Sequence, residues 1–108
     1  MNKLIITFLA LMATVAGIAL GADAKAGADI YNKTCKGCHG ADGATPSEAV
    51  GKMLQATIPV LASPAIQAKS DADFRTAITA GKGKMPPMKS VTGTQIDDVI
   101  AYLRSLKK

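Results

Sequence analysis

The stretch Cys35-Lys36-Gly37-Cys38-His39 decides how the rest of this 108-residue chain is interpreted. It places two thiols three positions apart and an imidazole directly after the second thiol. This C-x-x-C-H pattern is typical of covalent haem attachment, in which each thiol forms a thioether with one haem vinyl group. The adjoining histidine is then held under the iron as its proximal ligand. Cys35 and Cys38 are therefore the predicted attachment residues for one haem c, and His39 is the predicted proximal ligand.

Three other kinds of site use a pair of cysteines at this spacing. A thioredoxin-like redox pair needs a strand and a βαβ context, but the sequence has no convincing period-two alternation. A zinc site needs a fourth ligand, and the sequence contains two Cys and one His in all. A disulfide across two intervening residues is strained. Haem attachment is the interpretation with which the remaining sequence features agree.

The N-terminal stretch has the features of a secretory signal. Residues 1–3 carry a positive charge, residues 4–20 are almost wholly apolar, and Ala22-Asp23-Ala24 has the small-x-small pattern that signal peptidase accepts. We therefore predict that residues 1–24 are a removed signal peptide and that residues 25–108 form one domain in the periplasm. The apolar run is also close to the ~20 residues that a membrane span needs, so an uncleaved anchor is the alternative. We expect no membrane insertion of the mature chain.

The composition indicates which class of partner this domain binds and how large a core its side chains can form. Residues 25–108 contain 12 Lys and Arg against 7 Asp and Glu. A basic surface of this size favours acidic redox proteins as partners, whereas the modest charge and few aromatic residues argue against nucleic acid. The same residues contain three aromatic side chains, Tyr31, Phe74 and Tyr102, and no Trp. A domain this short buries little apolar surface of its own, so a large flat macrocycle is expected to fill its centre.

The hydrophobic pattern predicts an all-helical fold with long loops. Residues 25–34 show apolar positions at spacings of three and four. The final helix, from residue 94, has an apolar stripe at Ile96, Val99, Ile100, Leu103 and Leu106. Shorter helices are predicted after three capping signals: Thr45 to about Leu54, with Met53 and Leu54 inward; Ser63 to Ala68; and Ser70 to Ala80. Residues 82–91 contain too many Gly and Pro residues for regular structure.

Over its mature length the chain resembles the class I c-type cytochromes, a family of small monohaem proteins. Three stretches carry the resemblance: Gly27 with Ile30-Tyr31 and the haem motif through Gly40; Gly81 through Met85-Pro86-Pro87; and residues 99–103. The resemblance implies an all-α fold of four to five helices with long loops wrapped around one covalent haem. It also implies that the first and last helices cross closely at Gly27, with Tyr31 against Tyr102 or Leu103.

A methionine is the predicted distal ligand of the iron. His39 is the only histidine, so two imidazoles from one chain are excluded. Met85 is the first choice because Pro86 restricts it to an extended conformation and Pro87 stiffens the loop. The position also resembles the Met-Pro ligand of the family. Met88 is the runner-up, Met53 is expected to be core, and an open sixth position is the remaining alternative. The carbonyl that orients His39 is expected from Pro46 or Pro59.

These features predict a soluble, monomeric electron-transfer protein that shuttles single electrons and is not an enzyme. The first alternative is a haem c enzyme or gas sensor with an open or labile sixth position. The second is a haem subunit docked permanently to an oxidoreductase, which a large apolar surface patch would favour. The segments that frame the predicted haem are rich in lysine, which favours steering of an acidic partner. These lysines are Lys33, Lys36, Lys82, Lys84 and Lys89.

Overall fold

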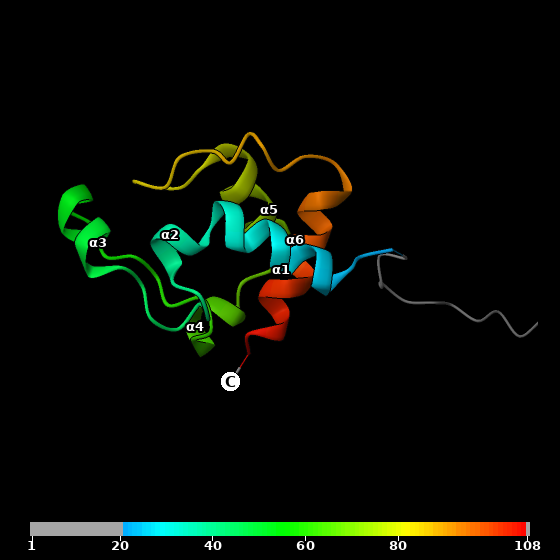
Figure 1. The fold of residues 1–108 in the computed structure, drawn as a ribbon, viewed down its shortest axis with the longest axis horizontal. Coiled ribbons are helices and arrows are strands. Elements are labelled where there is room, and N and C mark those ends of the chain that lie inside the picture. The colour runs from blue at the N-terminus through cyan, green and yellow to red at the C-terminus, as the bar shows by residue number, and fades with distance from the viewer. Residues whose placement is uncertain (1–20, 108) are drawn as a thin grey trace, which may run out of the picture.

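The computed structural model describes residues 21–107, which form six helices joined by loops (Figure 1). Within these residues no strand occurs, and Lys82 and Met85 form one isolated β-bridge. The all-α prediction is confirmed, but the described residues form six helices rather than four to five, because residues 36–39 of the cysteine motif form a short helix of their own. The predicted signal peptide lies almost wholly outside the described residues. The helices are α1 (Ala24–Thr34), α2 (Lys36–His39), α3 (Glu48–Leu54), α4 (Pro64–Gln67), α5 (Asp71–Ala80) and α6 (Thr94–Ser105).

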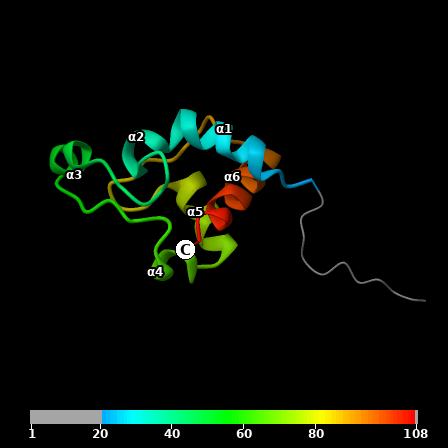
Figure 2. The same cartoon turned by 60° about the horizontal axis from the view of Figure 1, so that its bottom comes forward.

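The first and last helices cross in close contact, as Figures 1 and 2 show. Gly27 lies at the crossing, where a Cβ atom would come within 1.9 Å of the Asp98 carbonyl oxygen and 3.0 Å of the Tyr102 Cβ. Only a residue without a side chain allows the two backbones to approach this closely. The predicted role of Gly27 is therefore confirmed.

The hydrophobic core forms around this crossing. Tyr31 of α1 is fully buried, and its ring packs against Tyr102 of α6 with 5.0 Å between centroids and 56° between ring planes. Such tilted aromatic pairs contribute about 0.5–1.5 kcal/mol beyond the area that they bury. The predicted aromatic contact is thus confirmed. The other members of the core cluster are Phe74, Ile78, Val91, Ile96, Val99, Ile100 and Leu103.

Two of the three predicted capping signals sit where the sequence indicates, and the third is shifted. Ser63 caps α4, and Ser70 forms a capping box with Asp73 at the start of α5. The prediction that Thr45 caps α3 is wrong, because α3 begins at Glu48 and Ser47 is its N-cap. The Ser47 backbone is extended, and its hydroxyl accepts the Val50 N–H at 3.3 Å. Residues 45–46 therefore belong to the preceding loop.

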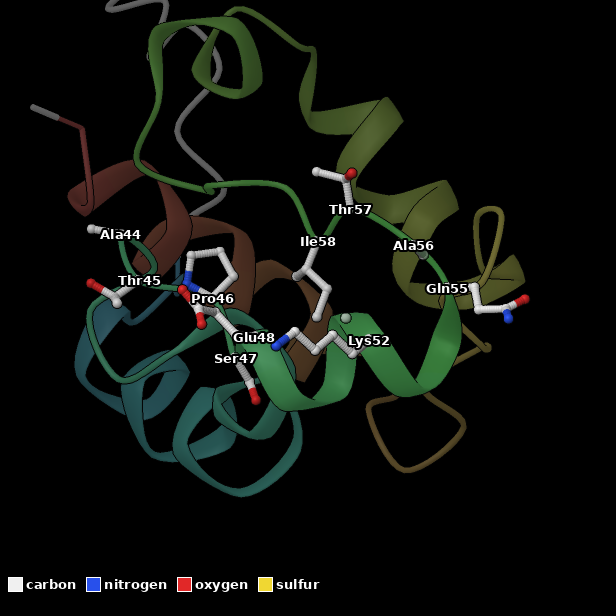
Figure 3. A pocket seen from close by; sticks show the side chains of 11 residues that line it. Ala44, Thr45, Pro46, Ser47, Glu48, Lys52, Gln55, Ala56, Thr57 and Ile58 are labelled. Atoms are coloured by element: carbon white, nitrogen blue, oxygen red, sulfur yellow. The ribbon is translucent and has the colours of Figure 1, made fainter.

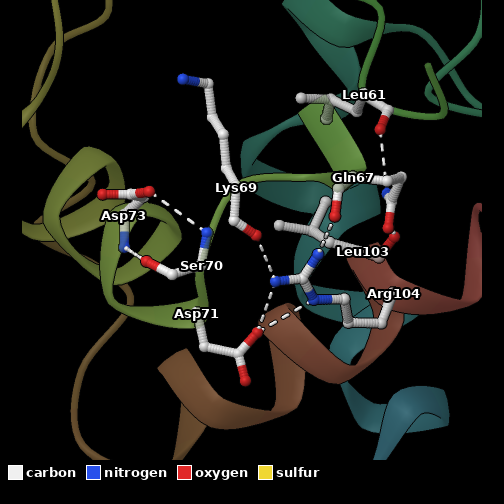
Figure 4. Close-up of polar contacts among 8 residues, drawn as sticks. All are labelled: Leu61, Gln67, Lys69, Ser70, Asp71, Asp73, Leu103 and Arg104. Carbon is white, nitrogen blue, oxygen red and sulfur yellow. Dashed lines mark hydrogen bonds and ion pairs between the residues drawn. The ribbon is translucent and has the colours of Figure 1, made fainter. Parts of the chain in front are cut away.

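Arg104 joins α6 to the segment between α4 and α5 (Figure 4). Its guanidinium donates to the carbonyl oxygens of Gln67 (2.8 Å) and Lys69 (2.6 Å) and to the Asp71 carboxylate (2.9 Å). It also lies 4.4 Å from the centre of the Phe74 ring, within cation–π range. This set of bonds satisfies carbonyl groups at the C-terminal end of α4, where no further helical turn follows to donate N–H groups to them.

Helix α3 stands apart from this core. It contains no buried residue, and it lies far from the α1–α6 crossing in both Figure 1 and Figure 2. Met53 is 74% exposed, so the expectation that Met53 points inward is wrong. Leu54 is half-buried. None of its seven residues is buried by other parts of the chain between residues 21 and 107.

Candidate haem-binding site

The cysteine motif follows directly after α1 and so begins at one edge of the core. Thr34 is the last residue of α1, Cys35 is its C-cap, and α2 begins one residue later. The Cys35 N–H continues the helical pattern by donating to the Tyr31 carbonyl at 2.8 Å, and the His39 N–H donates to the Cys35 carbonyl at 3.0 Å. Because Tyr31 is anchored in the core, this ladder fixes the start of the motif relative to the fold.

Both cysteines are free thiols in different surroundings. Cys35 is half-buried, and its sulfur lies 3.4 Å from the Thr34 hydroxyl oxygen. Burial raises the pKa of the Cys35 thiol, and the Thr34 hydrogen bond opposes that rise. Cys38 is exposed. The pair is therefore available for bonds to a group that lies alongside α2.

The imidazole of His39 is oriented by a backbone carbonyl. Its Nδ1 lies 3.2 Å from the Pro59 carbonyl oxygen. A carbonyl oxygen only accepts hydrogen bonds, so Nδ1 carries the proton and Nε2 keeps its lone pair. Burial lowers the pKa of His39, against the opposing effect of the Pro59 hydrogen bond, and thereby favours the neutral ring. The neutral ring with a free Nε2 is the form that binds iron. Pro59, rather than Pro46, is the residue in contact.

The segment that contains α3 is tied to the motif at both of its ends. At one end, the Ser47 N–H donates to the Cys38 carbonyl at 2.9 Å. At the other end, the Pro59 carbonyl accepts from His39. The sequence analysis did not predict this contact between Ser47 and Cys38. The signal that could have found it is the Ser47 hydroxyl, because serine is a common residue at the start of a helix.

Met85 lies in a tight turn that follows α5. The Lys82 N–H donates to the Met85 carbonyl and the Met85 N–H donates to the Lys82 carbonyl, both at 2.9 Å. Gly81 has φ +78°, and a Cβ there would lie 2.6 Å from the Met85 carbonyl oxygen. The turn therefore depends on glycine, because an L side chain at Gly81 would be both strained and obstructed. Met85 is half-buried and takes no part in the hydrophobic core cluster.

Met88 has a different environment from Met85. Its side chain packs against the core cluster, and its backbone N–H donates to the Ile78 carbonyl at 2.8 Å. A side chain engaged in this way contributes to packing between the loop and α5. The two candidate ligands are thus separated by location, with Met88 on the core and Met85 in the turn.

A shallow pocket lies beside α3 (Figure 3). In Figure 3 the Ile58 side chain points toward Lys52 of α3, and the Pro46 ring lies beside it. None of the predicted haem-binding residues lines this pocket. Between residues 21 and 107, no group of three or more His, Cys, Asp or Glu side chains is placed to hold a metal ion, so no zinc cluster forms there.

Comparison with known proteins assigns the family. The profile of the family described as "Cytochrome C oxidase, cbb3-type, subunit III" matches residues 22–103, which include the cysteine motif, the methionine turn and both crossing helices. The chain belongs to this family, and it is a class I c-type cytochrome. Among solved structures, this cytochrome is similar to the KustC0563 c-type cytochrome, with 30% sequence identity and a TM-score of 0.62. That likeness covers 76% of this chain and 98% of the other. Among curated proteins, none matches the sequence significantly.

Membership of this family implies one covalently bound haem c and haem-based electron transfer. The donor set fits such a group, since one free thiol lies at the N-cap of α2, the second lies within α2, and the helix ends in an imidazole with Nε2 unprotonated. The small core fits it as well, because the cluster of buried side chains includes only two aromatic residues.

Proposed function

We propose that this cytochrome is an exported, soluble carrier of single electrons whose haem iron is held between His39 and Met85. The observation that carries the proposal is the His39–Pro59 hydrogen bond, which leaves Nε2 available beside two free thiols. Cys35 and Cys38 would hold the haem through two thioether bonds. When bound, the haem supplies a reversible one-electron couple between ferric and ferrous iron.

The chain's own residues explain why Met85 is the better distal ligand. Met88 is committed to the core, whereas Met85 occupies a rigid turn closed by two backbone hydrogen bonds and followed by two prolines. A rigid turn keeps a weakly bound thioether in place in both oxidation states. Soft sulfur favours ferrous iron and so raises the reduction potential relative to a second nitrogen ligand.

A filled sixth position favours electron transfer over the alternatives of an enzyme or a gas sensor. Little rearrangement then accompanies each electron, and no side chain acts as an acid, base or nucleophile. The alternative of a permanently docked haem subunit would need a large exposed apolar patch. Within residues 21–107 the exposed large apolar side chains are Met53 and Val60, which is little surface for a permanent interface.

The proposed location is the periplasm. The sequence features of residues 1–24 support export, as does the family, because c-type cytochromes are generally exported. None of the helices between Ala24 and Ser105 has the length and apolar character of a membrane span. The uncleaved anchor of the alternative interpretation, residues 4–22, falls almost wholly outside the described part of the chain.

Acidic redox proteins are the proposed partners. Lys36 lies within the haem motif, and Lys82, Lys84 and Lys89 lie on the methionine loop, all of them exposed. Charges around the site of electron exit increase the rate of encounter with a negative partner, and salt screens that attraction. Electron-transfer rates with an acidic acceptor should therefore fall as ionic strength rises. Rates that stay flat across ionic strength would refute the steering.

The decisive experiment is expression in a bacterial host that matures c-type haem. The product should be red, its haem should stay with the chain after denaturation, and the Cys35→Ser, Cys38→Ser double variant should lose it. A redox titration should follow a single one-electron step, and carbon monoxide should not bind readily to the reduced protein. A colourless folded product with both thiols free would end the proposal, and ready carbon monoxide binding would favour the sensor or enzyme.

A further inference from the structure

Asp23 lies at the start of α1 and holds the first turn of that helix in place. Its carboxylate accepts hydrogen bonds from the backbone N–H groups of Lys25 (2.8 Å) and Ala26 (3.3 Å). Its own N–H donates to the Asp98 carboxylate at 2.8 Å, and its carbonyl accepts from the Gly27 N–H at 2.9 Å. Asp23 thus connects the beginning of α1 to α6 at the helix crossing.

The sequence pattern Ala22-Asp23-Ala24 alone points to a peptidase cut after Ala24, which would remove all four of these bonds. The new chain would begin at Lys25, so a free α-ammonium and a lysine side chain would both stand in the first turn of α1. No acidic side chain lies in that turn to offset them. Positive charge at a helix N-terminus is unfavourable because the backbone dipole is already positive there.

We propose that the export peptidase cuts on the N-terminal side of Asp23, so that the mature protein keeps this residue as the cap of α1. The inference rests on the proposed export of the chain. Ala19 and Gly21 also place small side chains at the third and first positions before a cut, so the bond between Gly21 and Ala22 meets the same requirement. Asp23 then stays linked through its amide N–H to Asp98.

The reaction is a peptide-bond hydrolysis that a membrane-bound signal peptidase performs. The bond between the Gly21 carbonyl carbon and the Ala22 nitrogen breaks. Water gives its hydroxyl to the carbonyl carbon and a proton to the nitrogen, and no electron is transferred. The new α-ammonium is on Ala22, one residue before the cap Asp23, and so stands outside the first turn of α1.

The N-terminus of the exported protein tests the proposal. The full-length chain is expressed in a haem-maturing host, purified from the periplasmic fraction, and analysed by intact mass and N-terminal sequencing. A chain that begins at Ala22 or Asp23 supports the proposal. A chain that begins at Lys25, or one that still begins at Met1, overturns it. The absorption spectrum of the same sample reports haem attachment separately. A failure of the proposed cleavage position is therefore distinguishable from a failure of the proposed function.

Substitutions test the physical premise in the same holoprotein. Asp23→Ala should lower the Tm by about 4–8 °C, the shift expected for loss of one helix cap in a domain of this size. Asp29→Ala is the matched control, because Asp29 is an exposed acid of the same helix outside the first turn. It should leave the Tm within a degree or two. Equal Tm values for the two variants would refute the capping role of Asp23.

Discussion

The Nδ1 of His39 lies 3.2 Å from the Pro59 carbonyl oxygen, although twenty residues separate the two along the chain. With His39 as the proposed iron ligand, this hydrogen bond would strengthen the imidazole as an electron donor through Nε2 and would favour ferric iron. Pro59→Gly keeps the carbonyl but loosens the backbone that aims it. We expect the reduction potential of this variant to rise in a potentiometric titration. Pro46→Gly, which alters a proline not bonded to His39, should leave the potential unchanged, and equal shifts for both would contradict the assignment.

The two methionines of the loop should respond differently to truncation. Met85→Ala should abolish the weak red charge-transfer band of sulfur bound to ferric iron and should let carbon monoxide bind to the reduced protein. Met88→Ala should keep the band but lose about 2–4 kcal/mol of stability, because its side chain packs against the core. Absorption spectra and thermal unfolding of both variants check this. Loss of the band in Met88→Ala alone would reverse the ligand assignment.

Gly27→Ala should be among the most damaging single-methyl additions to this chain. Its Cβ would lie 1.9 Å from a backbone oxygen, so the helices must separate, at a cost of about 1–3 kcal/mol or more. Chemical denaturation of the holoprotein measures the loss. Gly37→Ala is the control, because a Cβ at Gly37 meets no atom within 4 Å. Similar stabilities for the two variants would show that the helix crossing is less tight than described.

The two arginine–aspartate pairs of the chain should differ in their contribution to stability. Arg104→Ala removes bonds to two carbonyl groups and to Asp71, and it should cost about 1–3 kcal/mol of unfolding free energy. Arg75→Ala removes only an exposed pair with Asp97, worth less than about 1 kcal/mol. Urea titrations of both variants provide the comparison. The reverse order would indicate that the carbonyl groups are satisfied without Arg104.

The capping box of α5 should make stability depend on pH. Hydrogen bonds from the backbone and side chain of Ser70 hold the pKa of Asp73 below its usual range. Because the pKa is lower in the folded state, the ionised carboxylate stabilises the fold at pH values above the unfolded pKa of around 4. The stabilisation is lost as the pH falls through the folded pKa. Asp73→Asn should therefore lower the Tm near neutral pH, and the difference should shrink in acid.

A matched variant separates the charge from the cap. Ser70→Ala removes the hydroxyl but keeps the backbone N–H that donates to Asp73 at 3.1 Å. Its Tm should be lower than that of the wild type, and most of the pH dependence should remain. If Asp73→Asn lowers the Tm equally at neutral and acidic pH, the carboxylate charge is not the cause of the lower stability.

The sequence predicts those parts of the fold that depend on local chemistry. The helix ends at Ser63 and Ser70 follow from side chains that cap the backbone, and the apolar stripe of α6 follows from its spacing. Gly27 and Tyr31 were placed correctly because the resemblance supplied their partner helix. The caps and the stripe need no knowledge of the remaining structure, whereas the helix crossing does.

Other features depend on contacts that a sequence pattern does not contain. Met53 looks like a core residue by spacing, but no other part of the chain between residues 21 and 107 buries it. Pro46 and Pro59 were equal candidates for the carbonyl near His39, and only the path of the chain after α3 distinguishes them. The attachment residues and the iron ligands remain predictions from the motif, which the neighbouring contacts support.

The double attachment of the α3 segment, at Ser47 and at Pro59, has a consequence for how this protein can change. The two anchors hold the histidine side of the site, while the residues between them are exposed or half-buried. The cost of lengthening a flexible connection grows only slowly with the number of added residues. Evolution or a protein engineer can therefore insert new recognition sequences between the anchors without rebuilding the contacts at Ser47 and Pro59.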